Sequence, residues 1–420
     1  MKKQKVELLC PAGDMSKLRL AIAYGADAVY MGGSRFGLRA SSVVGDDFLP
    51  DAIAYAHHHG KKAYVTVNVF PRNTDFKDLK KYLVWLEKIG ADAVIVSDLG
   101  ALRLAKESTN LEIHISTQAN VLNKHTAMEY ANLGASRIIL ARECSLSEIT
   151  EIAKHLKGKC EIEVFVHGAM CVSYSGRCML SDYMINRSGN RGECAGSCRW
   201  NYSLVEAKRP GEYFPIEEDD NGTYIMNSRD LCLIEHLDEL KKAGVQSFKI
   251  EGRNKSEYYV AAVTGAYRRA IDGEVFDFGA ELEKTAHRPF TTGFIFPNEN
   301  TMHQNDANPI QSMHVVAMGI PPKSPRQRTV ASSTASQCDN NLKIILQRNV
   351  FCVGDELEVL SPGENQNKRF TVTKILDNKG QEVTRANKAG ELYQIDCPFP
   401  LGEFDFLRKQ GGHSNYKTTE

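Results

Sequence analysis

A short phrase that occurs four times in the first 250 residues constrains the fold of this chain more than any other feature. In each copy a glycine follows a helical stretch, and an apolar run begins two or three residues later. The copies lie at residues 25–32, 90–96, 134–140 and 244–250. A glycine that ends a helix just before a strand is typical of repeated β/α units, in which helices cover a parallel sheet.

The number of strands predicts how this sheet closes. Amphipathic stretches such as 75–89 separate nearly all of the apolar runs, which number eight by Glu251. The runs outside the repeated phrase are 6–9, 63–67, 111–115 and 162–166. Eight parallel strands within about 250 residues predict a TIM-type (β/α)8 barrel. An open, doubly wound sheet is the alternative, because strand order cannot be read from the sequence.

The same patterns predict the domain boundaries. We expect the barrel over residues 1–275, with a cysteine-rich insertion at 168–246 after strand seven, where a β/α connection is far longer than usual. Residues 276–340 have little periodicity and are predicted to be an irregular connector and linker. Short alternating segments predict a small all-β, barrel-like domain over 341–410, followed by a polar tail at 411–420.

Charge and hydropathy exclude several classes of protein. Lys plus Arg and Asp plus Glu both number 52, so no overall basic field attracts nucleic acid, and any binding of nucleic acid must be local. No apolar run is long enough for a signal-peptide core or a transmembrane helix. We therefore expect a cytoplasmic protein with no membrane partner. Its eleven cysteines are then not expected to form a disulfide framework.

Five of the cysteines gather in or next to the predicted insertion. They are Cys171, Cys178, Cys194, Cys198 and Cys232. The first four are spaced Cys-x6-Cys-x15-Cys-x3-Cys in a segment with too few apolar residues to pack by itself. Thiols with no histidine at ligand spacing suit an iron–sulfur cluster or structural zinc. The irregular spacing favours a cluster, because zinc sites usually use paired short knuckles. Unrelated structural cysteines are the remaining alternative.

Polar residues at the carboxyl ends of the strands are the candidates for catalysis, because the active site of such a barrel lies there. They are Asn68, Asp98, Gln118, Arg142, Glu143, His167, Glu251 and Arg253. The chain has neither a His-Glu-x-x-His helix nor a Gly-x-Ser-x-Gly elbow, so the sequence gives no support to standard peptidase chemistry.

Two long motifs resemble a known family. The run Glu-Val-Phe-Val-His-Gly-Ala-Met-Cys at 163–171 and Gly-Arg-Cys-Met-Leu-Ser at 176–181 resemble the signature of the collagenase-like peptidases, peptidase family U32. The opening Leu-Leu-Cys-Pro-Ala-Gly at 8–13 is similar to this family as well. Cys-Arg-Trp at 198–200, Asn-Ser-Arg-Asp-Leu-Cys at 227–232 and Lys-Ile-Glu-Gly-Arg at 249–253 resemble the branch that hydroxylates the wobble uridine of tRNA.

The resemblance implies a tRNA uridine 5-hydroxylase that takes its hydroxyl group from prephenate, without molecular oxygen, and depends on a [4Fe-4S] cluster. By motif position it implies Cys171, Cys178, Cys194 and Cys232 as cluster ligands, with Cys198 as the alternate fourth. The implied partner is the anticodon loop of tRNA. A wobble base is single-stranded and can turn into the opening of a barrel without melting a duplex.

Prephenate is a dicarboxylate, and arginine is the usual bidentate partner of a carboxylate. Arginines at strand ends are Arg39, Arg142, Arg177 and Arg253. Of these we expect Arg177 and Arg253 to bind the co-substrate, and His167 to act as acid or base by its placement alone. Two other functions remain open. One is a metal-assisted collagenase-like peptidase, and the other is a non-catalytic RNA-binding protein with a structural metal site such as zinc.

Overall fold

The computed structural model describes residues 6–38, 45–171, 173–200, 218–219, 222–223, 228–296, 310–320 and 341–411. The chain divides into two compact units. The first contains residues 1–278 and 287–309, and the second contains residues 279–286 and 310–420.

The first unit is a closed barrel of eight parallel strands. In order around the barrel they are β1 (Glu7–Pro11), β2 (Ala28–Gly32), β3 (Lys62–Val67), β4 (Ala93–Val96), β5 (Glu112–Ile115), β6 (Arg137–Ile139), β7 (Glu161–Ala169) and β11 (Ser247–Ile250). Strand β11 pairs with both β7 and β1, which closes the sheet. The predicted (β/α)8 barrel is therefore confirmed, and the open doubly wound sheet is wrong.

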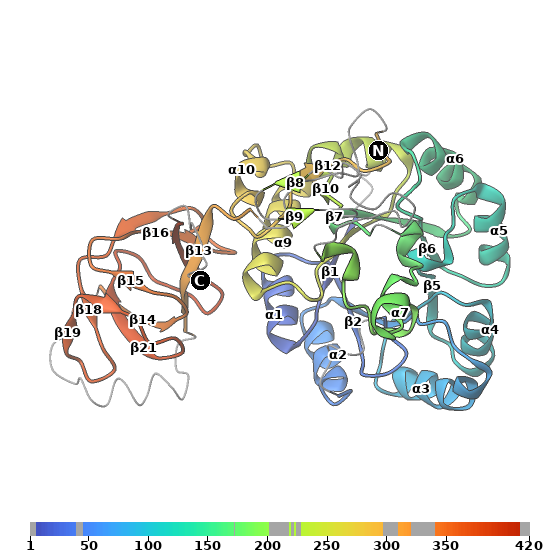
Figure 1. Cartoon of the computed structure of the whole chain (residues 1–420), viewed down its shortest axis with the longest axis horizontal. Helices are drawn as coiled ribbons and strands as arrows, with labels where there is room; N and C mark the ends of the chain where they lie inside the picture. The colour runs from blue at the N-terminus through green and yellow to red at the C-terminus, as the bar shows by residue number, and fades with distance from the viewer. Residues whose placement is uncertain are drawn as a thin grey trace, which may run out of the picture. The chain divides into compact units, whose positions relative to one another are not determined.

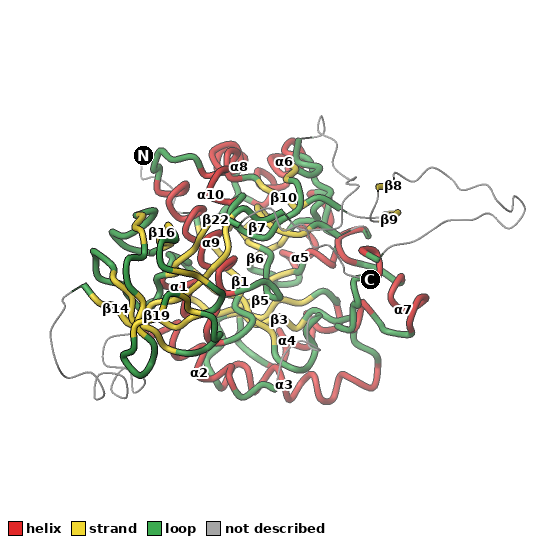
Figure 2. The backbone as a smooth tube through the Cα atoms, turned by 60° about the vertical axis from the view of Figure 1, so that its left-hand side comes forward, coloured by secondary structure: helices red, strands yellow, loops and turns green. Residues whose placement is uncertain are grey.

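Helices surround the barrel, with the strands on the inside, as Figures 1 and 2 show. They are α1 (Met15–Ala23), α2 (Phe48–His58), α3 (Phe76–Lys88), α4 (Leu99–Ser108), α5 (Lys124–Asn132), α6 (Leu146–Leu156), α8 (Leu237–Ala243) and α9 (Glu257–Asp272). Helix α3 buries Leu79, Tyr82, Leu83 and Leu86, which are one face of the predicted amphipathic stretch. Among the described residues, no helix is both long and apolar enough to cross a bilayer.

The repeated glycine phrase has a local cause. Its four glycines all have positive φ, for example +89° at Gly90 and +97° at Gly244. The N–H of Gly90 donates to the carbonyl of Glu87, and the N–H of Ala91 donates to that of Leu86, so both bonds close the end of α3. Only glycine adopts this left-handed turn without strain. The turn sends the chain directly into β4.

The amino ends of the strands enclose a charged cluster inside the barrel, which consists of Glu7, Arg137, Glu163 and Lys249. Arg137 contacts Glu7 and lies 3.2 Å from Glu163, and Lys249 Nζ lies 2.8 Å from Glu163 Oε1. Glu163 is fully buried. Burial opposes its ionisation, but Lys249 and Arg137 outweigh this effect and lower the pKa of Glu163. The charges of this cluster thus compensate one another.

The insertion begins at the long strand β7. After it come η4 (Tyr174–Gly176), α7 (Leu180–Ile185), η5 (Gly189–Arg191) and η6 (Ser197–Arg199). Two short strands, β8 (Glu218–Asp219) and β9 (Gly222–Thr223), form a ladder of their own. The chain returns as β10 (Asp230–Cys232), which pairs antiparallel with the end of β7 and in parallel with β12 (Phe290–Thr291). The last part of the predicted insertion holds η7 (Ile234–His236) and α8, which precede β11.

The second unit is built on an eight-stranded antiparallel sheet, as expected for an all-β domain. Its order is β17 (Arg369–Thr371), β16 (Glu356–Leu360), β22 (Phe406–Gln410), β13 (Met313–Gly319), β14 (Leu342–Gln347), β21 (Leu392–Asp396), β18 (Ile375–Leu376) and β19 (Glu382–Val383). Strands β15 (Phe351–Cys352) and β20 (Arg385–Ala386) form a separate pair. Val316, Ile345, Val359, Ile395 and Leu407 belong to its core.

The segment 276–340, expected to be irregular, contains the short helix α10 (Phe278–Leu282) and the central strand β13. Strand β13 pairs with β14 and with β22, which follows about ninety residues later. A strand whose partners lie so far along the chain has little local signal. Residues 279–286 belong to the second unit, where Arg408 is bound by Glu281 at 2.6 Å and by Glu358 at 3.0 Å.

Candidate active site

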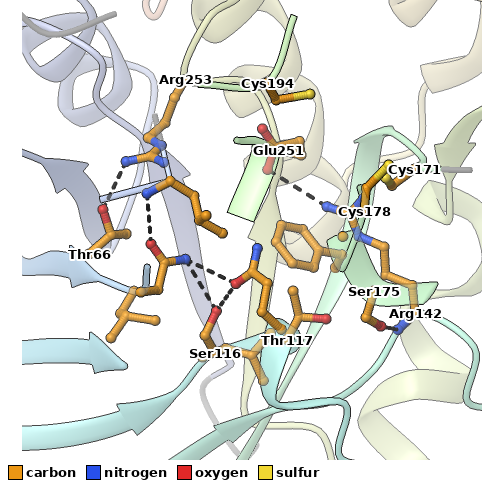
Figure 3. Close-up of a pocket in the computed structure, with 18 of the residues that line it drawn as sticks. Thr66, Ser116, Thr117, Arg142, Cys171, Ser175, Cys178, Cys194, Glu251 and Arg253 are labelled. Atoms are coloured by element: carbon orange, nitrogen blue, oxygen red, sulfur yellow. Dashed lines mark hydrogen bonds and ion pairs between the residues drawn. The ribbon is translucent and has the colours of Figure 1, made fainter. Parts of the chain in front are cut away.

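A pocket opens at the carboxyl ends of the barrel strands (Figure 3). The barrel contributes polar and charged groups such as Thr66, Ser116, Arg142, Glu251 and Arg253. The insertion contributes the thiols of Cys171, Cys178, Cys194 and Cys198. The cavity of about 150 Å³ is roughly ten times the space that one buried water needs, so it has room for more than a single water.

The pocket has an aromatic and cationic floor. Tyr30, Phe165 and Lys249 line it, and Lys249 Nζ lies 4.5 Å from the centre of the Tyr30 ring. Because Lys249 also contacts Glu163, it joins the pocket to the charged cluster below. Its two aromatic rings offer a flat apolar surface to a ring-shaped ligand.

Two arginines project into the pocket. Arg253 is 8% exposed, and its Nη1 donates to Thr66 Oγ1 at 2.8 Å. Arg142 donates to the carbonyl of Ala169, stacks 4.2 Å from the centre of the Phe165 ring and lies 3.7 Å from Glu251. Figure 3 shows both side chains held at opposite sides of the cavity. They are placed to bind carboxylate groups.

The other predicted arginines differ in position. Arg177 is exposed beside the pocket, and its Nε donates to the carbonyl of Gln118 at 2.7 Å, so it fixes the loop that carries Gln118. Its guanidinium lies over the ring of Phe70. Arg39 lies outside the described residues. Of the two arginines expected to bind the co-substrate, Arg253 lines the pocket and Arg177 lies at its rim.

His167 does not line the pocket, although it follows the pocket residue Phe165 by two positions. A bulge in the β7–β11 pairing explains this: Phe165 pairs with Lys249, but the next residue of β11, Ile250, pairs with His167. The extra residue turns His167 to the outer face of the strand. There it packs against the rings of Tyr259, Tyr267 and Phe290.

His167 is also poorly suited to proton transfer in this environment. It is 1% exposed, and burial, with smaller contributions from Lys255 and His287, lowers its pKa to about 3. Its Nδ1 lies 3.4 Å from the hydroxyl of Tyr267. The structure thus places His167 as a neutral residue between the barrel and α9.

A chain of hydrogen bonds joins polar residues on one wall of the pocket. Asn68 Oδ1 accepts from the N–H of Leu38 at 3.2 Å, and Asn68 Nδ2 donates to Gln118 Oε1 at 3.0 Å. The hydroxyl of Ser116 donates to the same oxygen of Gln118. Figure 3 shows these bonds beside Ser116. These hydrogen bonds hold the polar side chains of this wall in place.

A strained turn fixes the start of the insertion against the barrel. Ser175 has a φ of 42°, and its N–H donates to Glu143 Oε1 at 2.7 Å while its hydroxyl donates to Glu143 Oε2. The N–H of Arg142 donates to the Ser175 hydroxyl at 3.3 Å. This turn positions Cys171 and Cys178, on either side of it, at the pocket.

Hydrogen-bond donors lie next to two of the pocket thiols, Cys178 and Cys194. The N–H of Leu180 lies 3.3 Å from Cys178 Sγ, and the hydroxyl of Ser181 lies 4.0 Å from Cys194 Sγ. Cys171 Sγ lies 3.0 Å from the hydroxyl of Ser173. Donors directed at sulfur stabilise thiolates and tune clusters bound by them. The chemistry of this donor set fits a soft metal or an iron–sulfur cluster.

Cys232 and Cys198 differ in their relation to these thiols. Cys198 lines the pocket, whereas Cys232 lies on β10, 3.9 Å from the hydroxyl of Tyr267, where burial raises the pKa of its thiol to about 11. In the described part of the chain, no three Cys, His, Asp or Glu side chains converge closely enough to hold one metal ion. Of the predicted ligands, Cys171, Cys178 and Cys194 thus line the pocket and Cys232 does not, and the described ligands are not closed around a centre.

The sequence patterns do not single out Lys249, Thr66 and Ser116 as site residues. A signal for Lys249 is present in β11, where Ser247 and Lys249 alternate with Phe248 and Ile250. Polar residues at every second position of a buried strand indicate a polar barrel interior. Thr66 and Ser116 have no comparable local signal.

Comparison with known proteins identifies the family. The model of peptidase family U32 matches residues 13–305, and the model of the U32 C-terminal domain matches residues 326–408. The chain belongs to peptidase family U32. The family assignment from the signature at residues 163–181 is thereby confirmed.

Relatives within the U32 family include proteins that are named for RNA hydroxylation. The chain is 38% identical to tRNA hydroxylation protein P of Escherichia coli (strain K12), over 94% of both chains. It is 36% identical to tRNA hydroxylation protein P1 of Bacillus subtilis (strain 168), over 97% of this chain and 95% of that one. It is 35% identical to the 23S rRNA 5-hydroxycytidine C2501 synthase of Escherichia coli (strain K12), over 72% of this chain and 45% of the synthase.

Proposed function

We propose that this U32 protein hydroxylates tRNA, at C5 of the wobble uridine, with prephenate as the hydroxyl donor and with the help of a [4Fe-4S] cluster. The observation that carries the proposal is the pocket itself. Arg253, Lys249 and four thiols line one cavity in a chain similar over 94% of its length to a protein named for tRNA hydroxylation. A cytoplasmic location follows from a tRNA substrate.

The proposed reaction exchanges a hydroxyl group for a hydrogen atom. The C5–H bond of the base and the C–OH bond of prephenate break, while a C5–OH bond and a C–H bond form. The base is oxidised by two electrons and the donor is reduced by two, so the exchange needs no molecular oxygen.

The chain's own residues would bind and orient the reactants. Arg253 and Arg142 are placed to pair with the two carboxylates of the donor, and the rings of Tyr30 and Phe165 offer contact to its ring. The hydroxyl of Thr66 holds the Arg253 guanidinium in place at 2.8 Å. Side chains that are held in this way reduce the entropy lost on binding.

We propose Cys171, Cys178 and Cys194 as cluster ligands, with Cys232 or Cys198 as the fourth. The donors near Cys178 and Cys194 support this set, and the place of Cys198 on the pocket wall supports it as the alternate. When bound there, a cluster would supply one-electron transfer next to the ligand in the pocket.

Among the described residues, the pocket holds no nucleophile–histidine pair of the kind that serine and cysteine peptidases use. No histidine lines the pocket there, and His167 faces the opposite side of its strand. The buried hydroxyl of Ser175 is bonded to Glu143 and serves the turn.

The test is a reaction of anaerobically purified full-length protein with unmodified tRNA and prephenate, followed by mass spectrometry of the nucleosides. A gain of 16 Da on the wobble uridine that depends on prephenate is the expected result. Tight tRNA binding without any modified nucleoside would instead favour the non-catalytic RNA-binding function. Cleavage of casein by the same preparation would favour the peptidase.

A further inference from the structure

We propose that Gln118 selects uracil over cytosine by presenting an amide N–H donor to position 4 of the base. This inference rests on the proposed function, because it concerns which base the pocket accepts. Gln118 lines the pocket and is half-buried.

The orientation of the amide groups follows from a backbone group that can only donate. The N–H of Leu38 donates to Asn68 at 3.2 Å, so the acceptor atom of Asn68 must be its carbonyl oxygen. Asn68 is 6% exposed, and the hydroxyl of Ser97 donates to its main-chain carbonyl at 2.9 Å. Its Nδ2 must therefore point the other way, toward Gln118.

The same reasoning fixes the orientation of the Gln118 amide group. Because Asn68 Nδ2 donates at 3.0 Å, the atom of Gln118 that receives this bond is the oxygen, which also accepts from Ser116. The amide nitrogen is then left to face the cavity. The Gln118 amide nitrogen lies beside the pocket residue Gly176, since a Cβ added to that glycine would be 3.5 Å from the nitrogen. Within the part of the chain that the structure describes, this nitrogen has no hydrogen-bond acceptor.

The backbone of Gln118 is fixed as well. It lies in the turn η3 (Thr117–Ala119), where Thr117 Oγ1 donates to the carbonyl of Leu140 at 3.1 Å. Arg177 Nε donates to the carbonyl of Gln118 itself at 2.7 Å. A donor fixed at both its backbone and its oxygen discriminates well, because it cannot turn to suit a different ligand.

A fixed donor distinguishes the two pyrimidines at position 4. Uracil has a carbonyl oxygen there, which accepts a hydrogen bond, whereas cytosine has an amino group, which donates one. A cytosine in the same pose would place two donors against each other and leave both unsatisfied. Position 4 is next to C5, so a contact there also places C5 in the pocket.

The experiment compares two full-length tRNAs that differ only in having U or C at the wobble position. Wild-type protein, Gln118→Glu and Asn68→Asp are assayed for kcat/KM of hydroxylation with each tRNA. Wild type is expected to favour the U form by at least about tenfold. Gln118→Glu replaces the donor with an acceptor and is expected to shift this ratio toward C by at least about tenfold.

Asn68→Asp tests the chain of amides without changing Gln118. An aspartate accepts from Leu38 and also from the Gln118 amide nitrogen, so Gln118 turns its oxygen to the cavity and the ratio shifts toward C. Gln381→Glu, an exposed glutamine of the second unit, adds the same charge and is expected to leave the ratio unchanged. A fall in both rates with the ratio preserved in the two pocket variants would show a merely structural role and overturn the proposal.

Binding separates this proposal from the proposed reaction. Fluorescence anisotropy with short single-stranded RNAs that carry U or C at the central position gives a ratio of dissociation constants without any chemistry. If no hydroxylation occurs but Gln118→Glu still reverses the binding preference, Gln118 selects the base and only the proposed reaction fails. If wild type binds both RNAs equally, or binds neither, the proposal is overturned.

Discussion

The two ends of the barrel interior use their polar side chains differently. At the amino ends of the strands, the charged cluster pairs each member with another: Arg137 with Glu7 and Glu163, and Lys249 with Glu163. At the carboxyl ends, Gln118 and the pocket thiols face a cavity. Buried polar groups that satisfy one another stabilise a fold, whereas groups directed at a cavity are arranged for a ligand.

The comparison predicts that substitutions at the two ends fail in different ways. Changes in the charged cluster should lower the free energy of unfolding, because they leave a buried charge without its partner. Changes at the pocket should leave folding nearly intact and remove ligand binding or chemistry.

The largest expected effect is at the pocket thiols. Cys171→Ser, Cys178→Ser or Cys194→Ser should reduce the iron and sulfide content of anaerobically purified protein from about four of each to nearly none, and abolish hydroxylation. Far-ultraviolet circular dichroism should not change, because these residues lie outside the barrel core. The matched control is Cys352→Ser in the second unit, whose iron content should equal that of wild type. Full iron in all three pocket variants would refute the ligand set.

The fourth ligand can be found by the same assay. Cys198→Ser and Cys232→Ser are compared, and the variant that loses the cluster identifies the ligand. Cys198 lines the pocket with the other three thiols, while Cys232 is buried beside Tyr267. If Cys232 is the ligand, cluster binding must turn its thiol away from Tyr267, and the fluorescence of the buried tyrosines should change on reconstitution.

The next effect is at the opposite end of the barrel. Arg137→Met removes the cation that Glu7 and Glu163 share, and should lower the free energy of unfolding by about 3–5 kcal/mol in urea titrations. Glu161→Gln removes the half-exposed partner of the same arginine and should cost less than about 1 kcal/mol. If the two variants lost the same free energy of unfolding, burial would not decide how strongly the ion pairs of this cluster stabilise the barrel.

A smaller effect is expected at Arg253, which separates binding of the co-substrate from cluster assembly. Arg253→Met should raise the KM for prephenate by about 10–100-fold, the range for one charged hydrogen-bond pair, with iron content unchanged. Arg177→Met at the exposed rim should raise it less. If Arg177→Met had the greater effect on KM, the carboxylates would bind at the rim instead of in the pocket.

The sequence is most informative where structure is local. The four glycines at positive φ, the amphipathic face of α3 and the eight apolar strands each depend on residues within one turn or one strand. These features were enough to predict the barrel. The cysteine spacing was likewise visible, because four of the five thiols lie within a 28-residue stretch from Cys171 to Cys198.

The remaining features of the site depend on pairing between distant residues. His167 faces outward because of a bulge between β7 and β11, which are separated by the whole insertion. The Asn68–Gln118 bond joins residues fifty positions apart, and Arg137 meets Glu7 across 130 positions. Strand alternation alone would have placed His167 on the same face as Phe165. No local pattern reports the bulge that prevents it.

The smallest expected effect is a pH dependence at the amino ends of the strands. His114 is fully buried against Tyr64, and burial lowers its pKa despite the nearby Glu112. Near and below about pH 6.5 the unfolded chain therefore binds more protons at this residue than the folded barrel does, so stability falls as the pH decreases. The slope from this residue should not exceed about 1.4 kcal/mol per pH unit. Urea titrations between pH 7 and 5 should show a shallower slope of the unfolding free energy against pH for His114→Leu than for wild type; identical slopes would mean that the folded barrel does not lower the pKa of His114.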